Sequence, residues 1–104
     1  MKIVLIGVGE VGFHLAKALS EDGHDITAVD INPEKCRRIT EHLDAIEVEG
    51  NGASPKTLHK ARVEDADYVL CLTRIDEVNL IAAQQAHELG AKHIIARLRN
   101  QQYS

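Results

Sequence analysis

Three glycines near the amino terminus have the spacing that brings a peptide backbone against a phosphate group. Gly7, Gly9 and Gly12 follow an apolar run at residues 3–6 and precede an amphipathic segment. This is the order of strand, tight turn and helix that dinucleotide binding requires. Gly7 would allow the sharp turn, Gly9 the approach of a pyrophosphate, and Gly12 the close packing of the helix on the strand. The free N–H groups at the start of the helix would point at the phosphates.

An acidic residue ends the next apolar run. Asp30 follows Gly12 by 18 residues. A carboxylate in this place can accept both hydroxyls of an adenosine ribose and would repel a 2′-phosphate, so the pattern predicts an adenine nucleotide and favours NAD over NADP. Val8, Glu10 and Val11 stand between the glycines and belong to the same candidate site. The Glu10 carboxylate is expected to point away from a bound pyrophosphate.

The composition argues against several classes of protein. A length of 104 residues corresponds to one domain, and a single Phe without any Trp requires an aliphatic core. The net charge of −4 provides no basic stripe for nucleic acid, and the basic stretch at residues 35–38 is expected on a solvated helix face. No apolar run approaches the roughly 20 residues that span a bilayer. No signal peptide is recognised, so we expect a cytoplasmic location.

Few side chains have the arrangement of a reactive centre. Cys36 and Cys71 share no motif spacing and are expected to be buried thiols in a reducing compartment. The six histidines form neither a His-x-x-x-His pair nor a cluster with cysteine, so no zinc site is predicted. No serine stands in a nucleophile elbow, and no acid–base pair suited to hydride transfer is apparent. The sequence therefore predicts binding without catalysis.

Strands and helices are predicted to alternate along the whole chain. We expect strands at residues 2–6, 25–30, 45–48, 68–72 and 93–97, and helices at residues 11–22, 33–43, 54–61 and 77–89. The first helix is predicted to bury one face, formed by Val11, Leu15, Ala18 and Leu19. The acids at residues 76–77 are interpreted as an N-cap and a first-turn acid, with a ligand role as the alternative. This alternation predicts an α/β fold with a doubly wound, Rossmann-like parallel sheet of order 3-2-1-4-5, whose sixth strand is missing.

The carboxyl ends of parallel strands meet on one rim, where ligands of such sheets bind. Leu72 and Thr73 end the fourth predicted strand, and Thr73 could reach a ribose or a phosphate or act as an end cap. Arg97 leaves the fifth strand, with Arg99 two residues later; either could reach a phosphate or an acidic partner, or form a surface salt bridge. Asn51 could bond an adenine edge or occupy a left-handed turn.

A family resemblance rests on several of these segments. They are residues 7–12, 23–25, 29–30, 50–54 with Leu58, 66–67, 73–79 and 95–97. The most particular are Asp76-Glu77-Val78-Asn79-Leu80 and Ala96-Arg97-Leu98-Arg99-Asn100. On these residues the chain resembles, over almost its whole length, the nucleotide-binding domain of the TrkA/RCK family, also called KTN domains. These domains are cytoplasmic regulators of potassium transporters and channels.

The resemblance implies a ligand and the residues around it. The family binds NAD(H), and in some members ATP or ADP, without transforming the ligand. The phosphates would rest on Gly9, Glu10 and Val11, and the ribose on Asp30. The adenine would lie near Ile31 and the loop of Asn51, Gly52 and Ala53, and the rest of the ligand would face Thr73 and the loop after it.

Two positions differ from patterns seen in the family. Family members often carry Asp where this chain has Asn51. Some ATP-binding members place a basic residue where Glu10 stands, and an acid there would repel a γ-phosphate, which favours NAD(H).

The resemblance also implies partners. Nucleotide state would shift the geometry of the domain, and that shift would gate ion flow through a separate membrane subunit at the inner face of the cell membrane. Residues 1–104 would be one NAD(H)-binding domain, compatible with a fragment of a longer regulator. The predicted helix at residues 77–89 is apolar over more of its circumference than one sheet-facing stripe needs, so we expect a homo-oligomer, a dimer or a larger ring.

Two other functions remain open at this point. The chain could be the cofactor-binding half of an NAD-dependent oxidoreductase, although neither a substrate domain nor an acid–base group is visible. It could also be a structural or oligomerisation module with a vestigial site. Core packing alone does not demand the three glycines of the turn together with Asp30, which argues against that second alternative.

Overall fold

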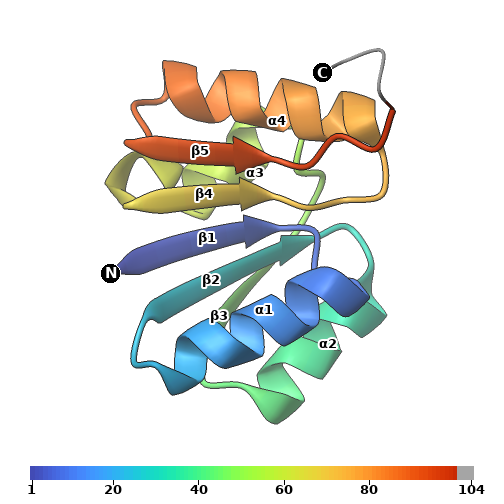
Figure 1. Ribbon diagram of the computed structural model, residues 1–104, viewed down its shortest axis with the longest axis vertical. Coiled ribbons are helices and arrows are strands. Elements are labelled where there is room, and N and C mark those ends of the chain that lie inside the picture. The colour runs from blue at the N-terminus through green and yellow to red at the C-terminus, as the bar shows by residue number, and fades with distance from the viewer. Residues whose placement is uncertain (101–104) are drawn as a thin grey trace.

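A parallel sheet of five strands forms the centre of the molecule (Figure 1). The computed structural model describes residues 1–100. The strands are β1 (Lys2–Ile6), β2 (Asp25–Asp30), β3 (Ile46–Glu49), β4 (Tyr68–Cys71) and β5 (His93–Ala96). Their order across the sheet is β3-β2-β1-β4-β5, and all neighbouring pairs are parallel. The predicted Rossmann-like fold class and strand order are confirmed.

Helices connect the strands and cover both faces of the sheet. They are α1 (Glu10–Glu21), α2 (Pro33–His42), α3 (Pro55–Lys60) and α4 (Asp76–Glu88), with a short 3₁₀ helix, η1 (Val63–Asp65), before β4. The side chain of Asn32 caps α2 by accepting a hydrogen bond of 2.8 Å from the N–H of Glu34. Most boundaries differ by about one residue from those predicted. Within residues 1–100, no helix has the length and apolarity to cross a membrane.

Two aliphatic cores lie on the opposite faces of the sheet. On one face Ile3 and Leu5 pack with Phe13 of α1 and Ile39 of α2. On the other face the second core brings Val4 and Ile6 of β1 together with Leu58 of α3 and Ala82 and Ala86 of α4. Successive side chains of a strand point to opposite faces, so β1 is apolar at every position from Ile3 to Ile6 because both faces are covered. Helices thus cover the sheet on both faces, and the carboxyl ends of its strands are the rim on which a site can form.

The buried face of α1 differs from the predicted one. The pattern predicts Val11, Leu15, Ala18 and Leu19. The structure buries Gly12, Phe13 and Ala16, leaves Val11 54% exposed, and leaves Ala18 exposed with the two leucines only partly covered. The reason is that α1 begins inside the glycine turn, where Gly12 lies directly against the Gly7 carbonyl. That contact sets the rotation of the helix and turns Phe13 towards the sheet.

The cysteines are buried and unpaired, as predicted. Burial, together with the nearby carboxylate of Glu47, raises the pKa of the Cys36 thiol from its ordinary value of 9.0 to about 11. Burial alone raises the pKa of the Cys71 thiol to about 12. Both thiols therefore stay protonated at neutral pH and behave as small apolar side chains.

Candidate functional site

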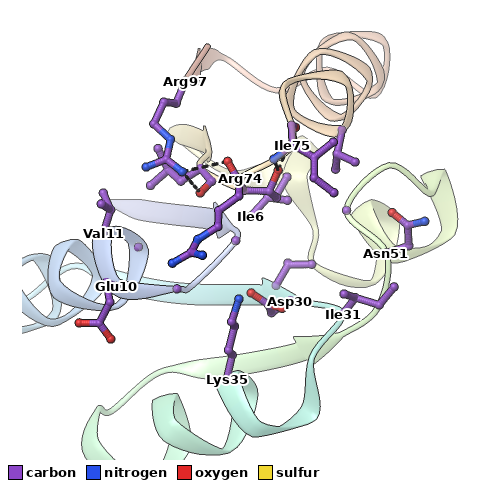
Figure 2. A pocket seen from close by; sticks show the side chains of 18 of the residues that line it. Ile6, Glu10, Val11, Asp30, Ile31, Lys35, Asn51, Arg74, Ile75 and Arg97 are labelled. Atoms are coloured by element: carbon purple, nitrogen blue, oxygen red, sulfur yellow. Dashed lines mark hydrogen bonds between the residues drawn. The ribbon is translucent and has the colours of Figure 1, made fainter. Parts of the chain in front are cut away.

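A cavity of about 680 Å³ opens at the carboxyl ends of the strands, between the glycine turn, the start of α2 and the loop that follows β4 (Figure 2). Its size is typical of sites for small molecules. It is lined by twelve of the predicted site residues, namely Gly7, Gly9, Glu10, Val11, Gly12, Asp30, Ile31, Asn51, Gly52, Leu72, Thr73 and Arg97. Two predicted residues lie outside the lining. The side chain of Val8 is buried in the core, and the N–H of Ala53 is used within its own loop.

Glycine occurs at the three positions of the turn for different reasons. Gly7 has a φ of +95°, and a Cβ there would lie 2.6 Å from the backbone nitrogen of Thr73. A Cβ on Gly12 would collide with the carbonyl oxygen of Gly7. The fold itself therefore needs both of these glycines.

Gly9 is different, because its backbone conformation suits any residue, with φ −68° and ψ −155°. A Cβ there would meet only the Nζ of Lys35, at 3.8 Å. Packing within residues 1–100 does not require a glycine at this position. The small residue instead keeps one stretch of backbone open to the cavity, beside the N–H groups that the first turn of α1 leaves without partners inside the helix. The residues present therefore fit a phosphate group.

Asp30 is held in place at the end of β2 by two backbone groups. One carboxylate oxygen accepts a hydrogen bond of 2.9 Å from the N–H of Val8, and the other accepts one of 2.9 Å from the N–H of Asn32. The residue is 9% exposed and lines the cavity. Each carboxylate oxygen can accept a further hydrogen bond, so the group remains able to receive hydroxyl donors such as those of a ribose.

The carboxylate of Glu10 is directed away from the cavity, as Figure 2 shows. It accepts a hydrogen bond of 2.7 Å from Arg38 on α2 and lies 3.4 Å from the ring of His14. The hydrogen bond and the charge of Arg38 lower the pKa of Glu10. Arg38 also covers the ring of Phe13, with its guanidinium carbon 3.8 Å from the ring centre. The negative charge of the turn is therefore compensated on the outer side of α1.

The opposite wall of the cavity is organised by a buried amide. Asn79 of α4 is fully buried, and its Oδ1 accepts hydrogen bonds from the N–H of Thr73, at 2.9 Å, and from the Thr73 hydroxyl, at 2.7 Å. Its Nδ2 donates to the carbonyl oxygens of Thr73 and Arg97, at 3.0 and 2.9 Å. Asn79 thus ties the ends of β4 and β5 together. Sequence reasoning missed this role, although Asn79 stands in the most family-specific segment.

Arg97 and Asp76 complete this wall. The guanidinium of Arg97 donates through Nη2 to the carbonyl oxygens of Leu72 and Thr73, at 3.2 and 3.0 Å, while its buried Nε has no partner within residues 1–100. Asp76 is the first residue of α4 and not its N-cap, which is Ile75. Its carboxylate accepts hydrogen bonds from the N–H groups of Arg99 and Asn100, at 2.9 and 2.7 Å. Asp76 therefore holds the chain that leaves β5.

The loop after β3 closes the remaining side. A Cβ on Gly52 would collide with the side chain of Ile6, so the loop can approach β1 only with glycine there. Asn51 accepts a hydrogen bond of 2.9 Å from the N–H of Ala53 and also lines the cavity. Its amide therefore shapes the turn, but the predicted left-handed conformation is wrong, because Arg62 is the non-glycine residue with a positive φ within residues 1–100. Ile31, 67% exposed, offers an apolar surface at the mouth.

Two basic residues in the lining were not predicted as site residues. Lys35 belongs to the stretch at residues 35–38, predicted on a solvated helix face, and Arg74 follows Thr73 in the loop after β4. Lys35 stands in the first turn of the helix that begins just after Asp30. Side chains there lean towards the amino end of the helix, which faces the rim, and this signal could have found it. The described residues contain no group of His, Cys, Asp and Glu suited to a metal ion.

Comparison with known proteins finds relatives by sequence and solved structures with a similar fold. The family model of the TrkA-N domain matches residues 3–104. The chain is 42% identical over 103 residues to a Trk system potassium uptake protein TrkA homolog from Archaeoglobus fulgidus. That match covers 99% of this chain but only 23% of the relative, so the chain spans less than a quarter of the length of that protein.

Two solved structures share the fold at 20% identity. One is the NAD(P)-binding domain of an exopolyphosphatase-related protein from Archaeoglobus fulgidus, with a TM-score of 0.86 over 98% of this chain and 76% of that one. The other is the Kef CTD of Shewanella denitrificans in an AMP-bound form, with a TM-score of 0.82 over 99% of this chain and 62% of that one. At this identity the likeness concerns the fold alone.

Proposed function

The chain belongs to the TrkA-N family, and from that premise we propose that it is a nucleotide-sensing regulatory domain of a potassium transport system, with NAD(H) as its ligand. The observation that carries the proposal is the presence of both Gly9 and Asp30 at the same rim. The packing does not require a glycine at position 9, and the carboxylate of Asp30 is held in place by two backbone N–H groups. ADP and ATP are the alternative ligands.

Each part of the ligand would meet a different part of the cavity. The pyrophosphate would lie against Gly9 and the first-turn N–H groups of Glu10 and Val11. The adenosine ribose would donate to Asp30, and the adenine would lie between Ile31 and the loop of Asn51. Support for an adenine nucleotide also comes from the shared folds, one of an AMP-bound protein and one of an NAD(P)-binding domain.

The wall built by Asn79 suggests how occupancy would be transmitted. Thr73 faces the cavity, and Asn79 connects it to the carbonyl oxygen of Arg97. Asp76 then holds Arg99 and Asn100. A ligand that moves Thr73 would therefore act on the segment that leaves β5. We propose that this segment passes the nucleotide state on to a membrane potassium transporter or channel subunit, with the domain at the cytoplasmic face of the membrane.

The proposal also concerns the oligomeric state and the length of the whole protein. Residues 1–104 would form one domain of a longer, homo-oligomeric regulator, since the TrkA relative is far longer than this chain. Ile81 of α4 and Ile95 of β5 are 45% and 53% exposed, and an apolar surface of this kind suits a contact between copies. Sedimentation at micromolar concentration should show a dimer or a larger species. A strictly monomeric chain would contradict the assembly step.

Calorimetric titration tests the ligand. NADH should bind more tightly than NADPH, because Asp30 would face the additional phosphate. Equal affinity for both would contradict the role of Asp30, and no binding of NADH, NAD, ADP or ATP would overturn the proposed function. Steady turnover of NADH with hydroxy acids or aldehydes would favour the alternative, the cofactor-binding half of an oxidoreductase.

A further inference from the structure

Two cationic side chains extend into the cavity from opposite sides. Figure 2 shows Lys35 extending from the first turn of α2 and Arg74 from the loop between β4 and α4. The Nζ of Lys35 lies 3.8 Å from the point that a Cβ of Gly9 would occupy. Lys35 is therefore next to the stretch of backbone that is open to the cavity.

Neither cation has a partner of opposite charge within residues 1–100. The ion pairs of the described residues involve other cations, among them Arg37 with Glu34 and Arg38 with Glu10. Arg97 is also engaged, since its Nη2 donates to two carbonyl oxygens. Arg99 also lines the cavity, and it forms none of the ion pairs found within residues 1–100. Lys35, Arg74 and Arg99 thus keep side-chain hydrogen-bond donors that are available to a ligand, and Figure 2 shows Lys35 and Arg74 extending into the cavity.

The charge that a phosphate chain would meet differs from the one the sequence suggests. The acid of the glycine turn, Glu10, is paired with Arg38 on the outer side of α1. Its repulsion of a terminal phosphate is therefore compensated by a neighbouring positive charge. Lys35 and Arg74 place two further positive charges on the inner side, where the phosphates would lie.

We propose that Lys35 and Arg74 form a two-sided cation clamp that selects adenine nucleotides with at least two linked phosphates. This inference rests on the nucleotide site proposed above. Lys35 acts as a point charge on the phosphate held at Gly9, and Arg74 offers a planar guanidinium to the next phosphate. ADP and ATP are then ligands of the same cavity as NADH, and AMP and adenosine bind more weakly. This reverses the expectation from Glu10 that a γ-phosphate is repelled.

Charge-neutral variants of similar length test the clamp. Adenosine, AMP, ADP and NADH are titrated into the full chain and into Lys35→Gln and Arg74→Gln. Arg37→Gln is the matched control, because it removes the same charge from α2 at a side chain paired with Glu34 and outside the cavity lining. We expect each cavity variant to weaken ADP 5- to 20-fold and adenosine less than 2-fold, with the control unchanged for both. The affinity for ADP should also lose part of its salt dependence in the two variants.

The outcomes separate the clamp from the site. Equal losses for adenosine and ADP, or equal losses in Arg37→Gln, would overturn the clamp. So would wild-type affinity for ADP in both cavity variants while NADH still binds, and in that case the proposed function would stand. If the wild-type chain binds no adenine nucleotide at all, the clamp and the proposed function both fail.

Discussion

Replacing Gly9 by valine should abolish nucleotide binding and leave the domain folded. The backbone of Gly9 already has dihedral angles open to any residue, and a new Cβ meets only the flexible end of Lys35. The residue is the N-cap of α1, a place where glycine is preferred over valine, so we expect a loss of about 1 kcal/mol in the free energy of unfolding. The branched side chain would fill the space next to the backbone in which the pyrophosphate is proposed to lie.

The expected loss of affinity for NADH is at least about 100-fold, or about 2.8 kcal/mol at 1.4 kcal/mol for each factor of ten. Urea unfolding followed by circular dichroism measures the stability, and calorimetry with NADH measures the binding. A second variant, Gly9→Ser, keeps a favourable N-cap side chain and should also lose affinity while unfolding at nearly the wild-type urea concentration.

Gly12→Ala provides the contrast. Its Cβ would collide with the Gly7 carbonyl, which is backbone and cannot move aside cheaply. We expect a loss of roughly 1–3 kcal/mol in the free energy of unfolding, as for other overpacked sites. Binding and stability should therefore fall together in Gly12→Ala and separately in Gly9→Val. A folded Gly9→Val variant with wild-type affinity for NADH would refute the assignment of this turn to the phosphates.

Three further results are expected. Asp30→Ala should weaken NADH by roughly 1–3 kcal/mol in calorimetry, the usual effect of losing hydrogen bonds to a charged group, and unchanged affinity would remove Asp30 from the site. Asn79→Ala should lower the free energy of unfolding by roughly 2–4 kcal/mol in urea, because four hydrogen bonds of a buried amide are lost; a loss below about 0.5 kcal/mol would contradict its place in the wall. The pKa of the Cys36 thiol is about 11 in the folded chain, against an ordinary value of 9.0. Above pH 9 the unfolded chain therefore binds fewer protons than the folded chain. The free energy of unfolding should fall as the pH rises from about 9 to about 11. Chemical unfolding across that range should show a shallower fall in Cys36→Ala, and identical slopes would contradict the buried, protonated thiol.

The sequence by itself determined the order of the elements and the position of the rim. Alternating apolar runs and amphipathic segments predict a doubly wound sheet, because the periodicity of a segment is a property of the local chain. The glycine turn and Asp30 could be found in the same way, since each stands at a fixed offset from the end of a strand. Both lie in the lining of the cavity.

The tertiary structure alone decided which side chains reach that cavity. Lys35 and Arg38 come from one basic stretch of α2, yet the first lines the cavity and the second pairs with Glu10 on the outer side of α1. Arg97 leaves β5 at the predicted rim, but its guanidinium is bound to carbonyl oxygens at the end of β4. The direction of a long side chain depends on the rotation of its helix and on partners that are distant in sequence. These are set by the packing of one element against another, and the local pattern of residues does not contain them.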